Sequence, residues 1–279
     1  MRKFISGILV LCMLILPITS FAVEKEEAKK EFVQLDPINI EKQSSNGGVN
    51  VTSSGFNTAI EIKEGERYFD TIDVSRDTKY YKVEFPKNGA VEFWLNSIPK
   101  GTDYDLDIYN ENRKRVAYSE RNHNDTESII MNVESRQWYY LTVHAFDGYD
   151  SNDTYYVRAE YCSDSTLEPN ETYKDAFRMG DIDVVHDTIS SSSDEDWYRV
   201  SNMAYNFSHP LILEDIPEGT DYDLEVYDES RNLIDSSRRG GNKSERIDFE
   251  YKSRGVYYIR VYSFSGSDRS KPYRLYFDY

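Results

Sequence analysis

Apolar and polar residues alternate along much of the second half of the chain. Two runs show the pattern most clearly, and their apolar sets are Tyr222, Leu224 and Val226, then Tyr257, Ile259 and Val261. The residues between them are Asp223, Glu225 and Tyr227, then Tyr258, Arg260, Tyr262 and Phe264. A period of two is typical of a strand with one buried and one open face. Loops rich in Asp, Ser, Asn and Gly separate such runs, which predicts many short strands.

The chain contains one long internal repeat. The motif Ile-Pro-x-Gly-Thr-Asp-Tyr-Asp-Leu occurs at Ile98–Leu106 and again 118 positions later at Ile216–Leu224. Upstream, Asp77–Tyr81 corresponds to Asp194–Tyr198 with an offset of 117. A repeat of this length is a whole domain rather than a solenoid unit. The sequence therefore predicts an all-β chain of two tandem antiparallel β-sandwiches, a first copy over 51–161 and a second over 162–279 with a linker at its start.

The first 50 residues differ from both copies. Residues 1–22 have a basic start, an apolar run and small residues at the end, which is the pattern of a secretory signal peptide. Residues 23–50 are rich in Glu and Lys, then in Ser, Asn and Gly, and predict a flexible spacer. Only Cys162 remains after the leader, so no intrachain disulfide is expected, and a tolerated linker residue is the simplest interpretation. We expect a secreted, extracellular protein.

The charge excludes some classes of partner. The chain has 33 Lys and Arg against 50 Asp and Glu, a net charge of −17. Nucleic-acid binding needs a basic surface, and docking on anionic lipid needs the same. We therefore expect no nucleic-acid partner and, beyond the leader, no membrane insertion. An acidic chain is instead compatible with cation sites built from carboxylates.

Three stretches resemble the bacterial pre-peptidase C-terminal (PPC) domain. They are Asp194–Tyr198, Gly219–Tyr227 and Gly255–Gly266, the last followed by Tyr273, Arg274 and Leu275. This family is similar to the collagen-binding domains of clostridial collagenases. The resemblance covers both copies and implies jelly-roll-like sandwiches. It departs from the usual family arrangement, because no peptidase domain accompanies the sandwiches here.

The resemblance also implies a calcium site in the second copy only. In calcium-binding relatives, an acidic Glu-x-Asn-Asp segment and an acidic turn before an aromatic strand hold the metal jointly. Carried over by position, the ligands are Glu168, Asn170, Glu171 and Asp196, with Ser193 or Asp194 supplying a further oxygen. Glu171 stands where the family usually has Asp. A solvated acidic linker and turn is the alternative. Lys79 replaces Asp196 in the first copy, so no such site is expected there.

The outward residues of the last long strand form a candidate binding wall: Tyr258, Arg260, Tyr262 and Phe264. In collagen-binding relatives, aromatic residues at the positions of Tyr262 and Phe264 contact the ligand. Rigid aromatic rings suit contact with an extended protein and also stack on sugar rings. The alternative is that these rings pack under a loop. The first copy has His144 where the second has Tyr262, so it is expected to bind differently or not at all.

The sequence favours a non-catalytic role. The repeated pairs Asp103/Asp105 and Asp221/Asp223 follow a Gly at the start of a predicted strand, which is typical of turn chemistry. None of the four histidines lies in a metal-protease motif, and no nucleophile elbow is present. We expect a binding protein for an extracellular protein, such as a collagen-like chain, or for a polysaccharide, with calcium ordering the linker. The alternative is an accessory, stabilising or inhibitory partner of a separately encoded secreted protease.

Overall fold

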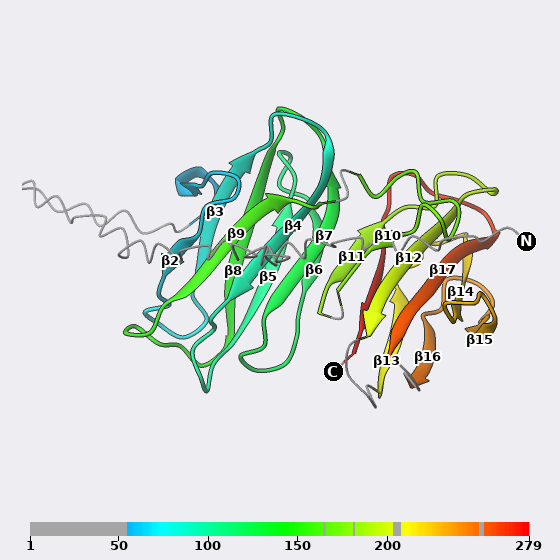
Figure 1. Ribbon diagram of the computed structural model, residues 1–279. Coiled ribbons are helices and arrows are strands. Elements are labelled where there is room, and N and C mark those ends of the chain that lie inside the picture. Colours follow the sequence, from blue (N-terminus) through cyan, green and yellow to red (C-terminus); the bar gives the residue numbers. More distant parts are fainter. Residues whose placement is uncertain (1–54, 164–165, 181, 203–207, 251–253, 279) are drawn as a thin grey trace, which may run out of the picture. The chain divides into compact units, whose positions relative to one another are not determined.

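A computed structural model describes residues 55–163, 166–180, 182–202, 208–250 and 254–278. The expected leader and spacer lie outside these residues. The described part contains eighteen strands and one short 3-10 helix, η1 (Phe56–Thr58) (Figure 1). None of its helices is long and apolar enough to span a membrane. The prediction of an all-β fold is confirmed.

The first copy forms nine strands: β1 (Ile60–Glu61), β2 (Tyr68–Asp70), β3 (Thr78–Glu84), β4 (Gly89–Asn96), β5 (Asp103–Tyr109), β6 (Arg115–Ser119), β7 (Glu127–Val133), β8 (Trp138–Asp147) and β9 (Tyr155–Tyr161). The second copy repeats them: β10 (Phe177–Arg178), β11 (Val184–Asp187), β12 (Glu195–Asn202), β13 (Ser208–Glu214), β14 (Asp221–Tyr227), β15 (Leu233–Ser237), β16 (Glu245–Glu250), β17 (Gly255–Ser265) and β18 (Tyr273–Phe277). The repeat found in the sequence is therefore also a repeat of strand order.

Each copy has its own five-stranded sheet, ordered β1-β3-β8-β5-β6 in the first and β10-β12-β17-β14-β15 in the second. The remaining strands of both copies form one eight-stranded sheet, ordered β16-β13-β18-β11-β7-β4-β9-β2. Most neighbouring strands are antiparallel, as predicted. The pairs β1–β3, β10–β12 and β7–β11 are parallel, which the alternation of residues along single strands does not reveal.

The pair β7–β11 joins the two copies. Ile129, Ile130 and Met131 of β7 lie opposite Val184, Val185 and His186 of β11. Successive residues of a strand point to opposite faces of its sheet. Accordingly, Ile129 and Met131 pack in the core of the first copy, whereas Ile130 packs in the core of the second. One strand thus serves two cores, and Cys162 is half-buried against the second of them.

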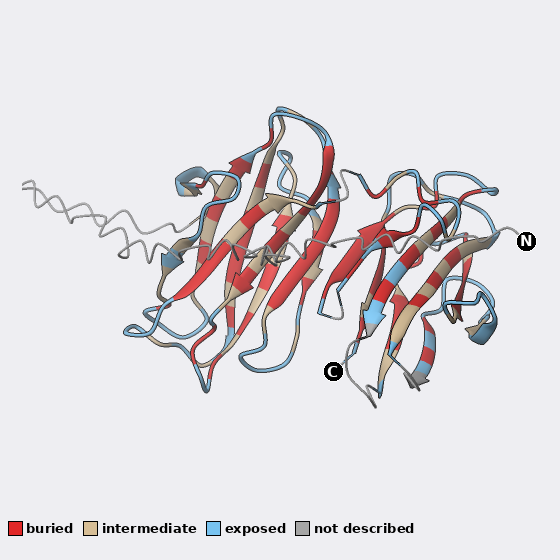
Figure 2. Ribbon diagram, viewed as in Figure 1, coloured by how far each residue is buried: buried red, intermediate tan, exposed pale blue. Residues whose placement is uncertain are grey.

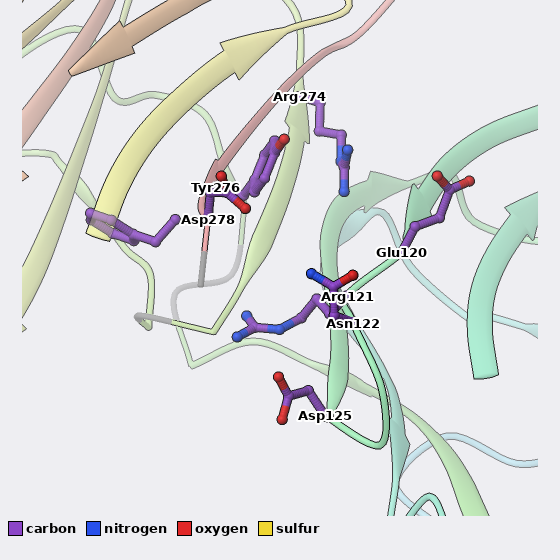
Figure 3. A pocket seen from close by; sticks show the side chains of 8 residues that line it. Glu120, Arg121, Asn122, Asp125, Arg274, Tyr276 and Asp278 are labelled. Carbon is purple, nitrogen blue, oxygen red and sulfur yellow. The ribbon is translucent and has the colours of Figure 1, made fainter. Parts of the chain in front are cut away.

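Polar contacts reinforce this junction. The Ser128 hydroxyl donates to Asp183 at 3.0 Å, and the Arg121 guanidinium donates to the carbonyl of Ile182 at 3.1 Å. The Arg274 guanidinium lies 4.3 Å from the centre of the Tyr118 ring. A pocket of about 240 Å³ lies here, between the hairpin after β6 and strand β18 (Figure 3). The two copies are therefore connected by strand pairing and by side-chain contacts.

Period-two alternation placed the inward residues correctly, and Figure 2 shows buried positions recurring along the strands. Tyr222, Leu224 and Val226 of β14 are fully buried. The outward residues Asp223 and Glu225, expected on an open face, are buried as well. Glu225 is covered because Arg260 of β17 and Arg238, which directly follows β15, form ion pairs with it.

Candidate functional site

Two segments of the second copy bring acidic residues together. Residues 168–171 precede the sandwich, and the backbone amide of Trp197 at the start of β12 donates to the carbonyl of Asn170 at 2.9 Å. This bond holds the segment against the turn between β11 and β12. Asp187 ends β11, Asp194 closes the turn, and Asp196 is the second residue of β12.

The carboxylates form two overlapping groups. Ligand oxygens of Glu168, Asp187 and Asp196 all lie within 4.8 Å of one another, and so do those of Glu168, Glu171 and Asp194. Glu168 belongs to both groups. Hard oxygen donors at this density are what Ca²⁺ prefers, because it takes 6–8 oxygen ligands in flexible geometry. These buried acidic clusters could therefore bind a metal ion.

Unpartnered oxygens indicate where a cation fits. Asn170 and Asp196 are fully buried. Neither the side-chain amide of Asn170 nor Oδ1 of Asp196 has a hydrogen-bond partner, although Oδ2 of Asp196 accepts a bond from Tyr273. A buried polar group without a partner costs about 1–3 kcal/mol. A cation coordinated by Oδ1 of Asn170 and Oδ1 of Asp196 would give both oxygens a partner, so the residues present fit a dication.

Two buried tyrosines fix the inner carboxylates. The Tyr198 hydroxyl donates to Asp187 at 2.9 Å and lies 2.5 Å from the Tyr273 hydroxyl. The Tyr273 hydroxyl in turn donates to Asp196 at 2.5 Å. Because both rings are fully buried, the two carboxylates have little freedom to turn away from each other. Buried hydrogen bonds therefore hold the two inner carboxylates side by side.

The site's electrostatics favour uptake of positive charge. Burial, followed by repulsion from Asp187, raises the pKa of Asp196 well above its usual range. Burial, followed by repulsion from Glu168, raises the pKa of Asp187 to about 7. Burial and the neighbouring Asp194 raise the pKa of Glu168 to about 7. These carboxyl groups hold protons where no cation compensates their charge.

The expected ligands are not all placed alike. Glu168, Asn170, Glu171, Asp194 and Asp196 lie in the two segments just described. The side chain of Ser193 is exposed, and its hydroxyl lies 3.2 Å from that of Ser191.

Asp187 was missed by sequence reasoning, because it lies outside the family segments used. A signal was present in the repeat. The tripeptide Asp-Thr-Ile occurs at Asp70–Ile72 and at Asp187–Ile189. Its Asp is the last residue of β2 in the first copy and of β11 in the second.

The first copy keeps the tyrosines and has a lysine where the second copy has Asp196. The Tyr81 hydroxyl donates to Asp70 at 2.8 Å and lies 2.6 Å from the Tyr155 hydroxyl, as in the second copy. The Lys79 ammonium stands at the position of Asp196 and is 3.4 Å from Asp77 and 3.7 Å from Asp73. Over the described residues, both acidic groups of metal-binding geometry belong to the second copy.

The expected aromatic wall is largely a packed network. Tyr258 lies under Tyr173, with ring centres 5.8 Å apart. Arg260 is held between Glu195 and Glu225 at 2.5 and 2.9 Å, and its guanidinium lies 4.2 Å from the centre of the Tyr262 ring.

The end of β17 is more open. The Tyr262 hydroxyl accepts a bond from Arg238 at 3.1 Å. Phe264 is 72% exposed, and its first-copy counterpart Phe146 is 66% exposed. The contact surface offered by this strand is therefore concentrated at Phe264 and the edge of Tyr262.

The acidic site and the aromatic face are physically connected. Tyr173 follows the acidic segment by two residues, and its ring contacts both Trp197 and Tyr258. The Arg231 guanidinium donates to the Tyr173 hydroxyl at 2.9 Å. Ordering of Glu171 would thus limit the movement of a ring that covers the aromatic face.

Comparison with known proteins gives fold-level likeness only. No family model matches the chain, and no curated protein matches it. The pre-peptidase C-terminal domain of a collagenase from Bacillus anthracis is 19% identical and covers 36% of this chain and 93% of its own, with a TM-score of 0.31. Tandem CBM51 modules of a family 98 glycoside hydrolase from Streptococcus pneumoniae are 12% identical over 74% of this chain and 81% of their own, with a TM-score of 0.24.

The CUB1-EGF-CUB2 domains of rat MASP-1 are also 12% identical, over 79% of this chain and all of their own, with a TM-score of 0.24. At these TM-scores the likeness carries no argument about what the chain binds.

Proposed function

We propose that the chain is a secreted, non-catalytic binding protein whose second copy holds calcium. The observation that carries the calcium assignment is the pair of buried, unpartnered oxygens, Oδ1 of Asn170 and Oδ1 of Asp196, beside four further carboxylates. Glu168, Asp187, Asp194 and Glu171 supply the remaining oxygens. An all-oxygen, carboxylate-rich set of donors favours Ca²⁺ over Zn²⁺, which prefers nitrogen and sulfur ligands.

Calorimetric titration with calcium tests the assignment. We expect tight binding to the intact chain and loss of that binding in Asp196→Ala, because the substitution removes a buried anionic ligand. Asp73→Ala in the first copy is the matched control and is expected to leave binding unchanged. Binding that persists in Asp196→Ala, or no binding to the unaltered chain, would contradict the calcium site.

The binding role rests on the exposed end of β17. Phe264 presents most of its ring to solvent, and Tyr262 lies beside it with a hydroxyl that already accepts a bond from Arg238. Rigid aromatic groups give contact area at low entropic cost. An extended protein, such as a collagen-like chain, or a polysaccharide fits a surface of this kind. Tyr258 and Arg260 then act as support, because both are engaged by neighbours within the sheet.

Retention on immobilised ligands tests this role. We expect retention on a collagen-like protein or a cell-surface glycan, and a loss of about tenfold or more in Phe264→Ala, as for a hot-spot aromatic. Phe146→Ala, at the same position of the first copy, is the control and is expected to have a smaller effect. Retention on a secreted protease alone would instead favour the accessory role.

A further inference from the structure

The junction between the copies uses one edge strand from each. Strand β7 of the first copy pairs in parallel with β11 of the second. The counterpart of β11 in the first copy is β2, and the counterpart of β7 in the second copy is β16. In the described part of the chain, β2 and β16 are the two terminal strands of the eight-stranded sheet (Figure 1).

Each molecule therefore has a counterpart of β11, which is β2, at one end of the eight-stranded sheet. It has a counterpart of β7, which is β16, at the other end. A terminal strand presents backbone N–H and C=O groups that accept a further strand. Joining β16 of one molecule to β2 of another repeats the existing geometry and leaves one edge of each kind free. Such a head-to-tail contact is heterologous and does not close unless its rotation happens to form a ring.

We propose that the chain self-associates head to tail, with β16 of one molecule adding in parallel to β2 of the next. This inference goes beyond the proposed function and depends on neither calcium nor an extracellular ligand. The partner is a second copy of the chain.

Charge complementarity supports this pairing. Within the chain, Ser128 on β7 donates to Asp183 just before β11. At the free ends, the corresponding residues are Arg246 on β16 and Glu66 just before β2, which carry opposite charges. Their side chains are 48% and 53% exposed. Arg246 now pairs with Asp248 and Asp278, and Glu66 pairs with Lys63. These are surface pairs that contribute little stability and can be exchanged.

The two residues of a second junction contact also have counterparts at the free ends. Arg121, which donates to the carbonyl of Ile182, corresponds to Arg239 in the loop before β16. Ile182 corresponds to Gly65, whose carbonyl accepts a bond from Arg158. A carbonyl oxygen has two lone pairs, so Gly65 can accept a second arginine.

An exposed apolar residue lies on β2. Phe69 on β2 is 47% exposed, whereas its counterpart His186 is buried at the junction against Tyr118 of β6. The counterpart of β6 in the second copy is β15, where Ser236 corresponds to Tyr118. Head-to-tail pairing would bring β15 beside β2 as β6 lies beside β11, and would cover the exposed Phe69 ring.

Sedimentation velocity on residues 23–279, over about a hundredfold range of concentration, tests the proposal. We expect the weight-average mass to rise with concentration past that of a dimer. Arg246→Glu and Glu66→Arg are each expected to weaken association by roughly tenfold or more, because like charges then face each other. The double variant, Arg246→Glu with Glu66→Arg, is expected to restore it.

Lys114→Glu changes charge at an exposed turn away from both edges and is the control. Unfolding curves of all variants show whether each is folded. A monomer at every concentration, a mass that stops at two chains, or a double variant no better than the single ones would overturn the proposal. Repeating the sedimentation measurement with and without calcium tests self-association independently of the calcium site.

Discussion

Replacing Glu127 by Gln is expected to stabilise the chain at alkaline pH and to flatten the dependence of its stability on pH. Glu127 is fully buried at the start of β7. It accepts hydrogen bonds from the Ser119 hydroxyl and from the backbone amide of Arg121. Burial outweighs these two bonds and raises the pKa of Glu127 to about 8.

The direction in which stability changes with pH follows from the difference between the pKa of Glu127 in the folded and in the unfolded chain. In the unfolded chain Glu127 ionises near its usual value of 4.5, whereas in the folded chain it keeps its proton up to about pH 8. Its contribution is therefore fully present below pH 4.5 and is lost as the pH rises through 8. At about 1.4 kcal/mol per pKa unit, the loss approaches roughly 5 kcal/mol. Gln has no proton to lose and retains an oxygen that accepts one of the two bonds.

Urea unfolding between about pH 5 and about pH 9 measures the effect. The free energy of unfolding of the unaltered chain is expected to fall over this range, and that of the variant to fall less. Glu84→Gln, at the exposed end of β3, is the control and is expected to leave the pH dependence unchanged. A Glu127→Gln variant that is destabilised equally at every pH would show that the buried carboxyl does not titrate as argued.

The strands and their inward faces could be predicted because alternation is a local property. Tyr222 and Leu224 are buried by any partner sheet that covers their side of β14, so no knowledge of that partner is needed. The covering of Asp223 and Glu225 could not be predicted in this way. For Glu225 it depends on Arg260 of β17 and on Arg238, which directly follows β15.

The junction could not be predicted, because its apolar residues look like ordinary core residues. Ile130 and Val185 have the alternation expected within a single sandwich, yet they pair with each other across the two copies. At the candidate metal site, the folded chain brings together four acidic residues named from the sequence, Glu168, Glu171, Asp194 and Asp196. Asp187 was missed because only the folded chain brings the end of β11 beside Asp196.

Replacing Asp196 by Asn is expected to have opposite effects without and with calcium. Without calcium, Asp196 is fully buried beside Asp187 and Glu168, and one of its oxygens has no partner. The substitution removes a buried carboxyl from this repulsion, and the amide can donate to a neighbouring carboxylate. We expect the metal-free variant to be more stable than the unaltered chain by about 2 kcal/mol near neutral pH.

With calcium, the unaltered chain is expected to become more stable than the Asp196→Asn variant. The unaltered chain is expected to gain about 2.7 kcal/mol at a calcium concentration 100 times the dissociation constant. In the variant, the amide oxygen is already engaged by the Tyr273 hydroxyl, and an anionic ligand has been lost. The response to calcium should therefore be small or absent, which leaves the variant less stable than the unaltered chain under the same conditions.

Urea unfolding in chelator and in excess calcium distinguishes this account from a structural role. If Asp196 only supported the fold, Asn would shift stability by the same amount in both conditions. Asp235→Asn, at an exposed position of β15, is the control and is expected to respond to calcium as the unaltered chain does. A crossing of the two stability curves as calcium is added requires that the carboxylate be costly when the site is empty and stabilising when a cation is bound. No purely structural carboxylate meets both conditions, because its contribution does not depend on calcium.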